Sequence, residues 1–128
     1  MHKKIIILLT VVLVSLTLSS CEDPEKALAK IKAVKINEVN LSQLNDGQYK
    51  GFYEFDGITT LKAKVQVLVT NNKIVDIKIL EHNNLLGGDA EKLPQKIIEK
   101  QSLKVDTISG ATFSSKVILK AVENALNK

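Results

Sequence analysis

The 128-residue chain carries 18 basic residues, all of them lysine, together with 14 acidic residues, two histidines and a single cysteine. A lone cysteine excludes an intrachain disulfide, a multi-cysteine metal site and an iron–sulfur cluster, and two histidines leave little else to hold a metal. The small lysine excess, without a basic block interleaved with aromatic residues, argues against a nucleic-acid partner. We therefore predict a small domain with no metal site and no nucleic-acid interface.

The N-terminus is typical of a secretory signal. Residues 1–4 form a basic leader, and the apolar run at residues 5–18 would span only ~21 Å as a helix, short of a ~30 Å hydrocarbon core. We expect residues 1–20 to be a signal peptide. The sequence LSSC at residues 18–21 resembles the bacterial lipobox, in which the cysteine is diacylated and becomes the mature N-terminus. An ordinary cysteine is the alternative, but its position favours lipidation of Cys21 and a location on the extracytoplasmic face of the cell membrane.

Residues 22–44 are polar and rich in lysine. Apolar residues at helical spacing permit a helix from about Pro24 to Ile36. Two roles are open for this part of the chain. It is either a lipid-anchored tether, residues 21–44, that lifts the domain off the membrane, or its helix docks on the domain.

The remaining residues, 45–128, are enough for one modest core. A strand is predicted at Tyr49–Phe55, after a turn signal. Residues 61–70 alternate between apolar and polar side chains, as a half-buried strand does, and residues 75–80 repeat the pattern. The Asn71-Asn72 pair between them predicts a tight turn, so the three strands form an antiparallel meander.

Two helices follow the strands. Residues 89–101 are predicted to be helical, with Pro94 in the first turn or as a break, and residues 113–126 form an amphipathic helix with one apolar stripe. The exposed face of this last helix is predicted to carry Lys116, Lys120, Glu123 and Asn124. The aromatic residues predicted to lie in the core are Tyr49, Phe52, Tyr53, Phe55 and Phe113. Strands first and helices later indicate an α+β fold, a small antiparallel sheet covered by helices on one face.

The segment Asp106–Ser115, DTISGATFSS, crowds five hydroxyls and one carboxylate around Gly110, just before the last helix. A helix N-terminus offers unpaired amides and the positive end of the helix dipole, which suit a phosphate. Thr112 would place a hydroxyl at the same spot. From residue types alone a plain helix cap is the favoured alternative, and Ser114 and Ser115 in the first turn are expected to be simple caps.

Residues 46–127 resemble the FMN-binding domain family, which includes the flavin domains of the C subunit of sodium-pumping NADH:quinone reductase and of the G subunit of Rnf complexes. The resemblance is carried by DGQYKG at 46–51, NKIVDI at 72–77 and LEHN at 80–83. It ends in the signature D-x-x-S-G-A-T, which residues 106–112 match without departure.

The resemblance implies that a flavin transferase joins FMN through a phosphoester to Thr112. Ser109, Gly110 and Ala111 would then form the attachment loop, with Ser109 ordering its turn. Asp106 would repel a phosphate directly. We expect it to shape the loop by accepting backbone amide hydrogen bonds, or to contact the transferase and its metal.

The loop after the third strand departs from the family pattern. The family commonly continues His-x-Glu-Thr-Pro-Gly, whereas residues 82–88 are HNNLLGG. His82 is therefore either a flavin contact or a surface histidine. Gly87 and Gly88 either let the backbone pass close to the flavin ring or belong to an ordinary loop.

We therefore expect a membrane-anchored, extracytoplasmic lipoprotein that carries one covalent FMN as an electron carrier and has no catalytic residue of its own. Its expected partners are the flavin transferase that matures it and a redox donor and acceptor that are proteins or quinone. Two alternatives stay open. One is a small flavin-dependent reductase acting on quinone or a soluble acceptor, and the other is a non-redox surface lipoprotein that keeps the fold.

Overall fold

The computed structural model describes residues 23–57, 59–83 and 87–127. The predicted signal peptide, Cys21 and residues 84–86 lie outside these ranges, so their predicted roles stay predictions. None of the helices in the described ranges is long and apolar enough to cross a membrane.

Three strands form one antiparallel sheet in the order β1-β2-β3. β1 spans Gly47–Asp56, β2 spans Thr60–Thr70 and β3 spans Lys73–Asn83, so each predicted strand is present. β1 and β3 extend beyond both predicted ends, and β2 begins one residue earlier than predicted. Buried apolar residues alternate along β2 with more exposed ones, because successive side chains point to opposite faces. The turn between β2 and β3 uses Asn71 and Asn72 at φ 50° and 59°, the positive values that a tight two-residue hairpin turn requires.

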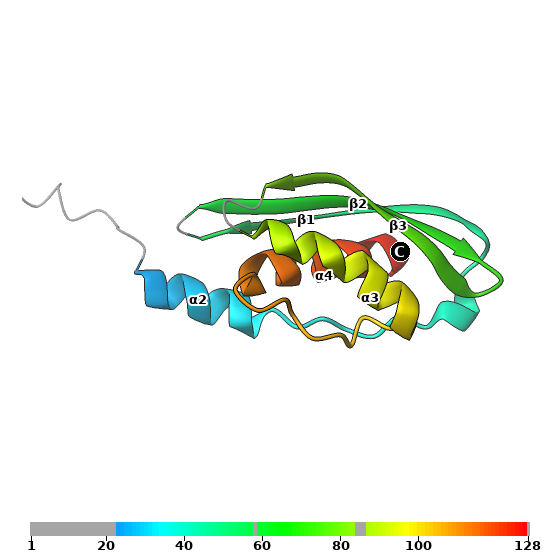
Figure 1. The fold of residues 1–128 in the computed structure, drawn as a ribbon, viewed down its shortest axis with the longest axis horizontal. Coiled ribbons are helices and arrows are strands. Elements are labelled where there is room, and N and C mark those ends of the chain that lie inside the picture. Colours follow the sequence, from blue (N-terminus) through cyan, green and yellow to red (C-terminus); the bar gives the residue numbers. More distant parts are fainter. Residues whose placement is uncertain (1–22, 58, 84–86, 128) are drawn as a thin grey trace, which may run out of the picture.

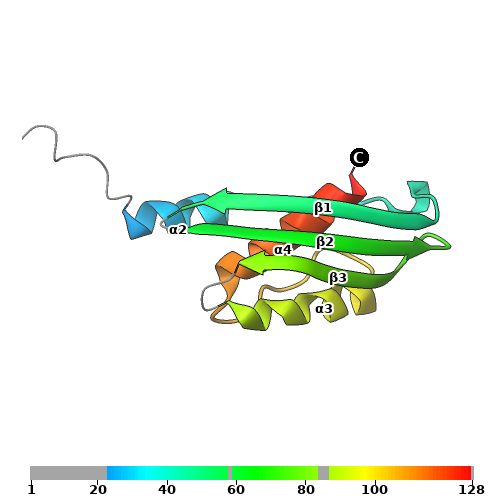
Figure 2. The ribbon, with the colours of Figure 1, turned by 90° about the horizontal axis from the view of Figure 1, so that it is seen from above.

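Helices cover one face of this sheet (Figure 1), and the view from above shows α4 beneath the strands and α3 alongside β3 (Figure 2). A 3-10 helix, η2 (Gly88–Lys92), leads into α3 (Leu93–Lys100). Pro94 lies in the first turn of α3, where its missing amide has no intrahelical partner to lose. α4 spans Thr112–Leu126 and packs on β1 and β2. The predicted α+β fold, with an amphipathic helix directly after the S-G-A-T segment, is confirmed.

Gln101 ends α3 and joins it to β3. Its backbone takes the left-handed conformation, with φ 50°. Its side-chain amide accepts a hydrogen bond from the Ile74 amide at 2.8 Å and donates one to the Ile74 carbonyl at 2.7 Å. One side chain therefore satisfies both backbone groups of Ile74 and ties the end of α3 to the sheet.

The core lies between the sheet and α4. Fully buried side chains on the two sides include Val65, Val67, Val69, Val117, Ile118 and Val122. The backbone of α4 comes very close to the sheet at Gly51, where a Cβ would lie 2.0 Å from the Ala121 carbonyl oxygen and 2.5 Å from the Ala125 amide nitrogen. Only a residue without a side chain permits this approach.

Three residues of the DGQYKG motif at the start of β1 make structural contacts. The Asp46 carboxylate accepts a hydrogen bond from the Asn71 amide at 2.7 Å and so joins the start of β1 to the β2–β3 turn. The Tyr49 hydroxyl donates to the Asn45 carbonyl at 2.7 Å. Gly51 admits α4. In this chain the three residues therefore fix the start of β1 and its packing on α4.

Phe52 is 47% exposed, so its predicted place in the core is wrong. It follows Gly51 in β1, and the alternation of side chains therefore directs it to the face that the helices leave uncovered. Phe55 is buried, and the other aromatic residues pack against the core as predicted: Tyr49, Tyr53 and Phe113.

Residues 24–44 pack against the domain. They form a helix, α2 (Pro24–Ala33), an extended stretch, and a short 3-10 helix, η1 (Leu41–Gln43). Ile31 is fully buried and Val39 is 8% exposed. Of the two roles open for this segment, the structure shows docking, and the helix ends at Ala33 rather than at Ile36.

The docked segment covers the polar face of α4, which was predicted to face solvent. Lys116 Nζ donates to the Val34 carbonyl at 3.0 Å. Lys120 Nζ donates to the Lys35 carbonyl at 3.1 Å. These lysines hold the docked backbone along the helix.

Glu123 was predicted to be exposed, and that prediction is wrong, because only 5% of its surface is accessible. Its carboxylate accepts hydrogen bonds from the Asn37 backbone amide at 3.0 Å and side-chain amide at 2.9 Å, and it pairs with Lys120 at 3.0 Å. Burial alone would raise the pKa of this carboxyl, but the bonds from Asn37 and Lys120 together outweigh it and hold the pKa below its ordinary value.

We expect Gly51→Ala to lower the free energy of unfolding by roughly 3 kcal/mol, because the added methyl group overlaps the backbone of α4 and forces helix and sheet apart. Urea unfolding measures the loss. Lys50→Ala, at the exposed neighbouring position, should stay within about 0.5 kcal/mol of the wild type. Equal stability of the two variants would contradict the close packing at Gly51.

We expect the stability that Glu123 provides to depend on pH. Its pKa is depressed in the folded state, so its contribution is complete above the unfolded-state pKa of about 4.3 and is lost as pH falls through the folded-state pKa. Wild type and Glu123→Gln should therefore differ in unfolding free energy at pH 7 and converge toward pH 3, as measured by chemical denaturation. Glu54→Gln, at an exposed position on β1, should show no comparable convergence. A constant difference for Glu123→Gln would overturn this account.

Candidate functional site

The segment predicted to hold a phosphate connects α3 to α4. Ser109 and Gly110 are exposed, Ala111 is buried, and Thr112 is half-buried as the first residue of α4. Gly110 has a φ of 76°, and a Cβ added there would meet nothing within 4 Å. The loop therefore turns its backbone toward open space immediately before Thr112.

The first turn of α4 is uncapped. Ala111 occupies the N-cap position, and no side chain accepts a hydrogen bond from the turn. The amides of residues 112–114 make no hydrogen bond to a described residue. In α2, by contrast, the Asp23 carboxylate accepts from the Glu25 amide at 3.2 Å. The plain-cap interpretation of the hydroxyl cluster is therefore wrong, and the unpaired amides with the positive end of the helix dipole suit an anion.

Ser115 holds the loop in place. It is fully buried, and its hydroxyl accepts a hydrogen bond from the Ile108 amide at 3.0 Å. The Ala111 amide donates to the Ile108 carbonyl, and the Ser115 amide to the Ala111 carbonyl, each at 2.9 Å. The sequence predicts that Ser115 caps the helix, and the structure shows that it does not. Its spacing from Ile118 and Val122, three and seven residues on, places it on the buried stripe and is the signal that identifies it.

Asp106 does not shape the loop. Its side chain is exposed and accepts no hydrogen bond from a described residue. The hydroxyl of Ser115 fills the role of amide acceptor that was predicted for this carboxylate. Contact with the flavin transferase stays a prediction for Asp106.

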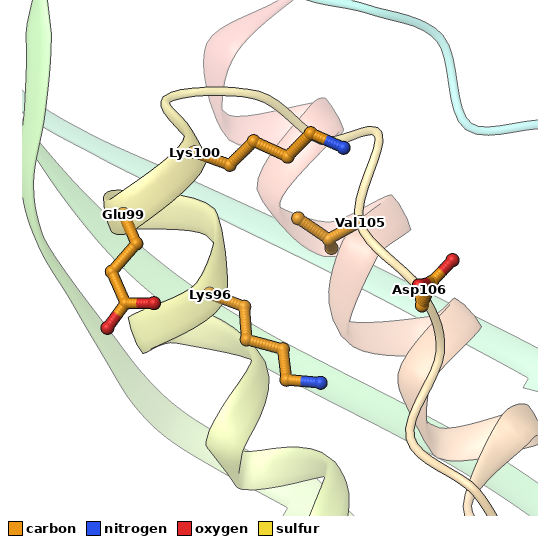
Figure 3. A pocket seen from close by; sticks show the side chains of 5 residues that line it. All are labelled: Lys96, Glu99, Lys100, Val105 and Asp106. Carbon is orange, nitrogen blue, oxygen red and sulfur yellow. The ribbon is translucent and has the colours of Figure 1, made fainter.

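Asp106 lines an open cleft of about 410 Å³ between α3 and the loop, together with Lys96, Glu99, Lys100 and Val105. Figure 3 shows both lysines extending from α3 toward the loop, whereas Glu99 points away from it. The volume falls in the range of ligand sites, about 300–1,000 Å³, but such sites are lined mostly by apolar and aromatic side chains. Four of the five lining residues are charged, so the cleft lacks the apolar lining expected of a binding site for a flavin ring.

His82 is not a surface histidine. Its imidazole side chain is 2% exposed, and its Nδ1 lies 3.2 Å from Glu91 Oε1 of η2. Gly87 is buried and Gly88 is exposed. η2 packs against α4, and both views place the end of β3, η2 and the start of α4 at the same end of the molecule (Figures 1 and 2). Contact of these residues with a flavin stays a prediction.

No metal site joins these residues. Within the described ranges, no three side chains of histidine, cysteine, aspartate or glutamate are grouped so that they could hold a metal ion. The chemistry available at the start of α4 is therefore that of hydroxyls, unpaired amides and the helix dipole.

Two comparisons with known proteins bear on the function of this chain. Residues 57–127 match the family described as the FMN-binding domain. A stretch of 66 residues, 49% of the chain, is 38% identical to NADH:acrylate oxidoreductase of Vibrio harveyi. That stretch covers 7% of the relative, so the chain spans less than a tenth of the protein that it resembles.

We expect Ser115→Ala to loosen the attachment loop, because it leaves the Ile108 amide without an acceptor at a cost of about 1–2 kcal/mol. Amide hydrogen exchange by NMR should show faster exchange at Ile108. Ser114→Ala removes an equally small and buried hydroxyl that accepts no loop amide, and exchange at Ile108 should stay unchanged. Unaltered exchange in Ser115→Ala would show that this bond does not hold the loop.

Proposed function

This chain belongs to the FMN-binding domain family, and from that membership and the LSSC sequence at residues 18–21 we propose that it is a membrane-anchored electron-transfer flavoprotein with FMN in phosphoester linkage to Thr112. FMN supplies the redox chemistry, and the protein supplies attachment, orientation and electrostatic surroundings. The observation that carries the proposal is the uncapped first turn of α4, which begins at the last residue of the D-x-x-S-G-A-T signature.

The geometry around Thr112 supports an esterified phosphate there. A phosphate diester keeps a negative charge, and the unpaired amides of residues 112–114 and the helix dipole stabilise charge of that sign. Gly110 leaves open space in front of the loop. A cap by a side chain would occupy the same amides, and none does.

The burial of the neighbouring hydroxyls narrows the choice of attachment residue. Ser114 is 3% exposed and Ser115 is fully buried, so a modifying enzyme reaches neither without opening the fold. Thr107, Ser109 and Thr112 stay accessible to different degrees. Among these three, Thr112 occupies the position that the family signature reserves for the flavin.

We propose that the chain works as a carrier within a longer electron-transfer route. The relative from Vibrio harveyi is named as an oxidoreductase, and the matching stretch covers 7% of it, which suits a flavin-bearing module combined with other parts that complete the reaction. In this chain's case, a separate electron donor and a separate electron acceptor would do what the other parts of the relative do.

The lipobox at residues 18–21 supports anchoring through a diacylated Cys21 on the extracytoplasmic face. A covalent bond to FMN suits that compartment, because a dissociated cofactor would be lost by dilution. The flavin transferase is then the partner needed for maturation.

Co-expression with a flavin transferase should add the mass of one FMN less one water to the wild-type protein, because one ester bond forms at Thr112. Intact-mass spectrometry measures the addition, and peptide mapping locates it. Thr112→Val, which keeps the shape of the side chain and removes its hydroxyl, should show no added mass.

Thr107→Val is the matched control, since it removes another hydroxyl of the same segment and should keep the full addition. An unmodified wild-type protein, produced beside a transferase that modifies a known substrate, would contradict covalent flavinylation. Modification that persists in Thr112→Val would contradict the assignment of the residue.

A further inference from the structure

The N-terminal segment enters the domain at the end that carries Thr112. Val34 contacts Lys116, Lys35 contacts Lys120, and Asn37 contacts Glu123. Each later residue of the segment thus meets α4 farther from its N-terminus, so the segment runs along α4 in the same direction. α2, which precedes it, therefore lies at the start of α4, and both views agree (Figures 1 and 2).

α2 is fixed to the body of the domain. Ile31 is fully buried in the core, and Ala27 is 2% exposed. The Ala27 methyl group lies beside Gly57, in the turn that ends β1, where an added Cβ would be 3.5 Å from it. From Pro24 onward, the described chain is therefore part of the packed domain.

The chain between the lipidation residue and this body is short. Cys21 and Pro24 are three residues apart, which allows at most ~10 Å of extended chain, and the 10 residues of α2 add ~15 Å. The end of α2, which contacts α4, is therefore held within about 25 Å of the lipid-bearing residue. The far end of the sheet lies another ~35 Å away, the length of the 11-residue strand β2.

We infer that the domain rests directly on the membrane with its Thr112 end toward the bilayer; this rests on the lipid anchor and the flavin site proposed above. The surface that meets the lipid consists of α2, the start of α4, and Gly57 and Thr59 between β1 and β2. Residues 23–35 carry Lys26, Lys30, Lys32 and Lys35 against Asp23 and Glu25, an excess of positive charge that suits anionic headgroups. The flavin then meets redox partners that reside in the membrane plane, not partners that approach from solution.

Two labels at opposite ends of β2 test this orientation. Thr59 is exposed in the β1–β2 turn, and Lys73 is exposed at the start of β3, beyond the other end of β2. Acylation occupies the only natural cysteine, so Thr59→Cys or Lys73→Cys can be labelled singly with a fluorophore. The full-length lipidated protein, in a Thr112→Val background, is placed in phosphatidylcholine–phosphatidylglycerol vesicles that carry an energy acceptor on their headgroups.

We expect severalfold greater energy transfer from the label at residue 59 than from the label at residue 73. Equal transfer, or greater transfer from residue 73, would overturn the orientation. A double variant, Ala27→Asp with Ile31→Asp, should release α2 and make the two labels more nearly equal. If the double variant unfolds, the difference in energy transfer between the two labels, measured with α2 docked, still tests the orientation.

The failures of the underlying proposals are recognised separately. Protein that does not stay on the vesicles and lacks the acyl mass contradicts the anchor, and with it the orientation. Protein that stays on the vesicles but shows equal transfer contradicts the orientation alone. The flavin plays no part in the measurement, because Thr112→Val removes its attachment residue.

Discussion

The contact between α4 and the sheet at Gly51 is the constraint on which the other parts of this protein depend. The backbone of α4 lies so close to β1 that a single methyl group at Gly51 would overlap it. α4, fixed in place by this contact, packs against three other parts of the protein. Its apolar stripe completes the core, its polar face holds the docked N-terminal segment, and its first turn carries the loop with Thr112.

The sequence predicts those parts of the fold in which the periodicity of apolar residues is unbroken. The alternation along residues 61–70 and the stripe along residues 113–126 predicted β2 and α4, and the Asn71-Asn72 pair predicted the turn that follows β2. The D-x-x-S-G-A-T signature located the candidate site at the start of α4. Local pattern was sufficient in each case, because each element's environment repeats along its own length.

Prediction failed where a polar side chain of α4 contacts a backbone group outside the helix. Glutamate and serine are residue types common at the surface and at helix caps. Nevertheless, Glu123 is buried and accepts a hydrogen bond from Asn37, and Ser115 is buried and accepts one from the Ile108 amide. The docking of residues 24–44 rests on such contacts, with partners more than eighty residues away. No pattern within the segment itself could reveal them, since its polar residues would suit solvent equally well.

The amide of Gln101 has a further consequence for the behaviour of this protein among its own copies. A three-stranded sheet has two open edges, and an unpaired edge strand is a template on which another chain can add. Gln101 occupies both backbone groups of Ile74 on the β3 edge, and Asn124 donates to the Phe52 carbonyl on the β1 edge at 2.9 Å. An incoming strand would have to displace these side chains before it could pair. Each edge is thus blocked at a point along its length, which guards the domain against self-assembly through its sheet when many copies are crowded together.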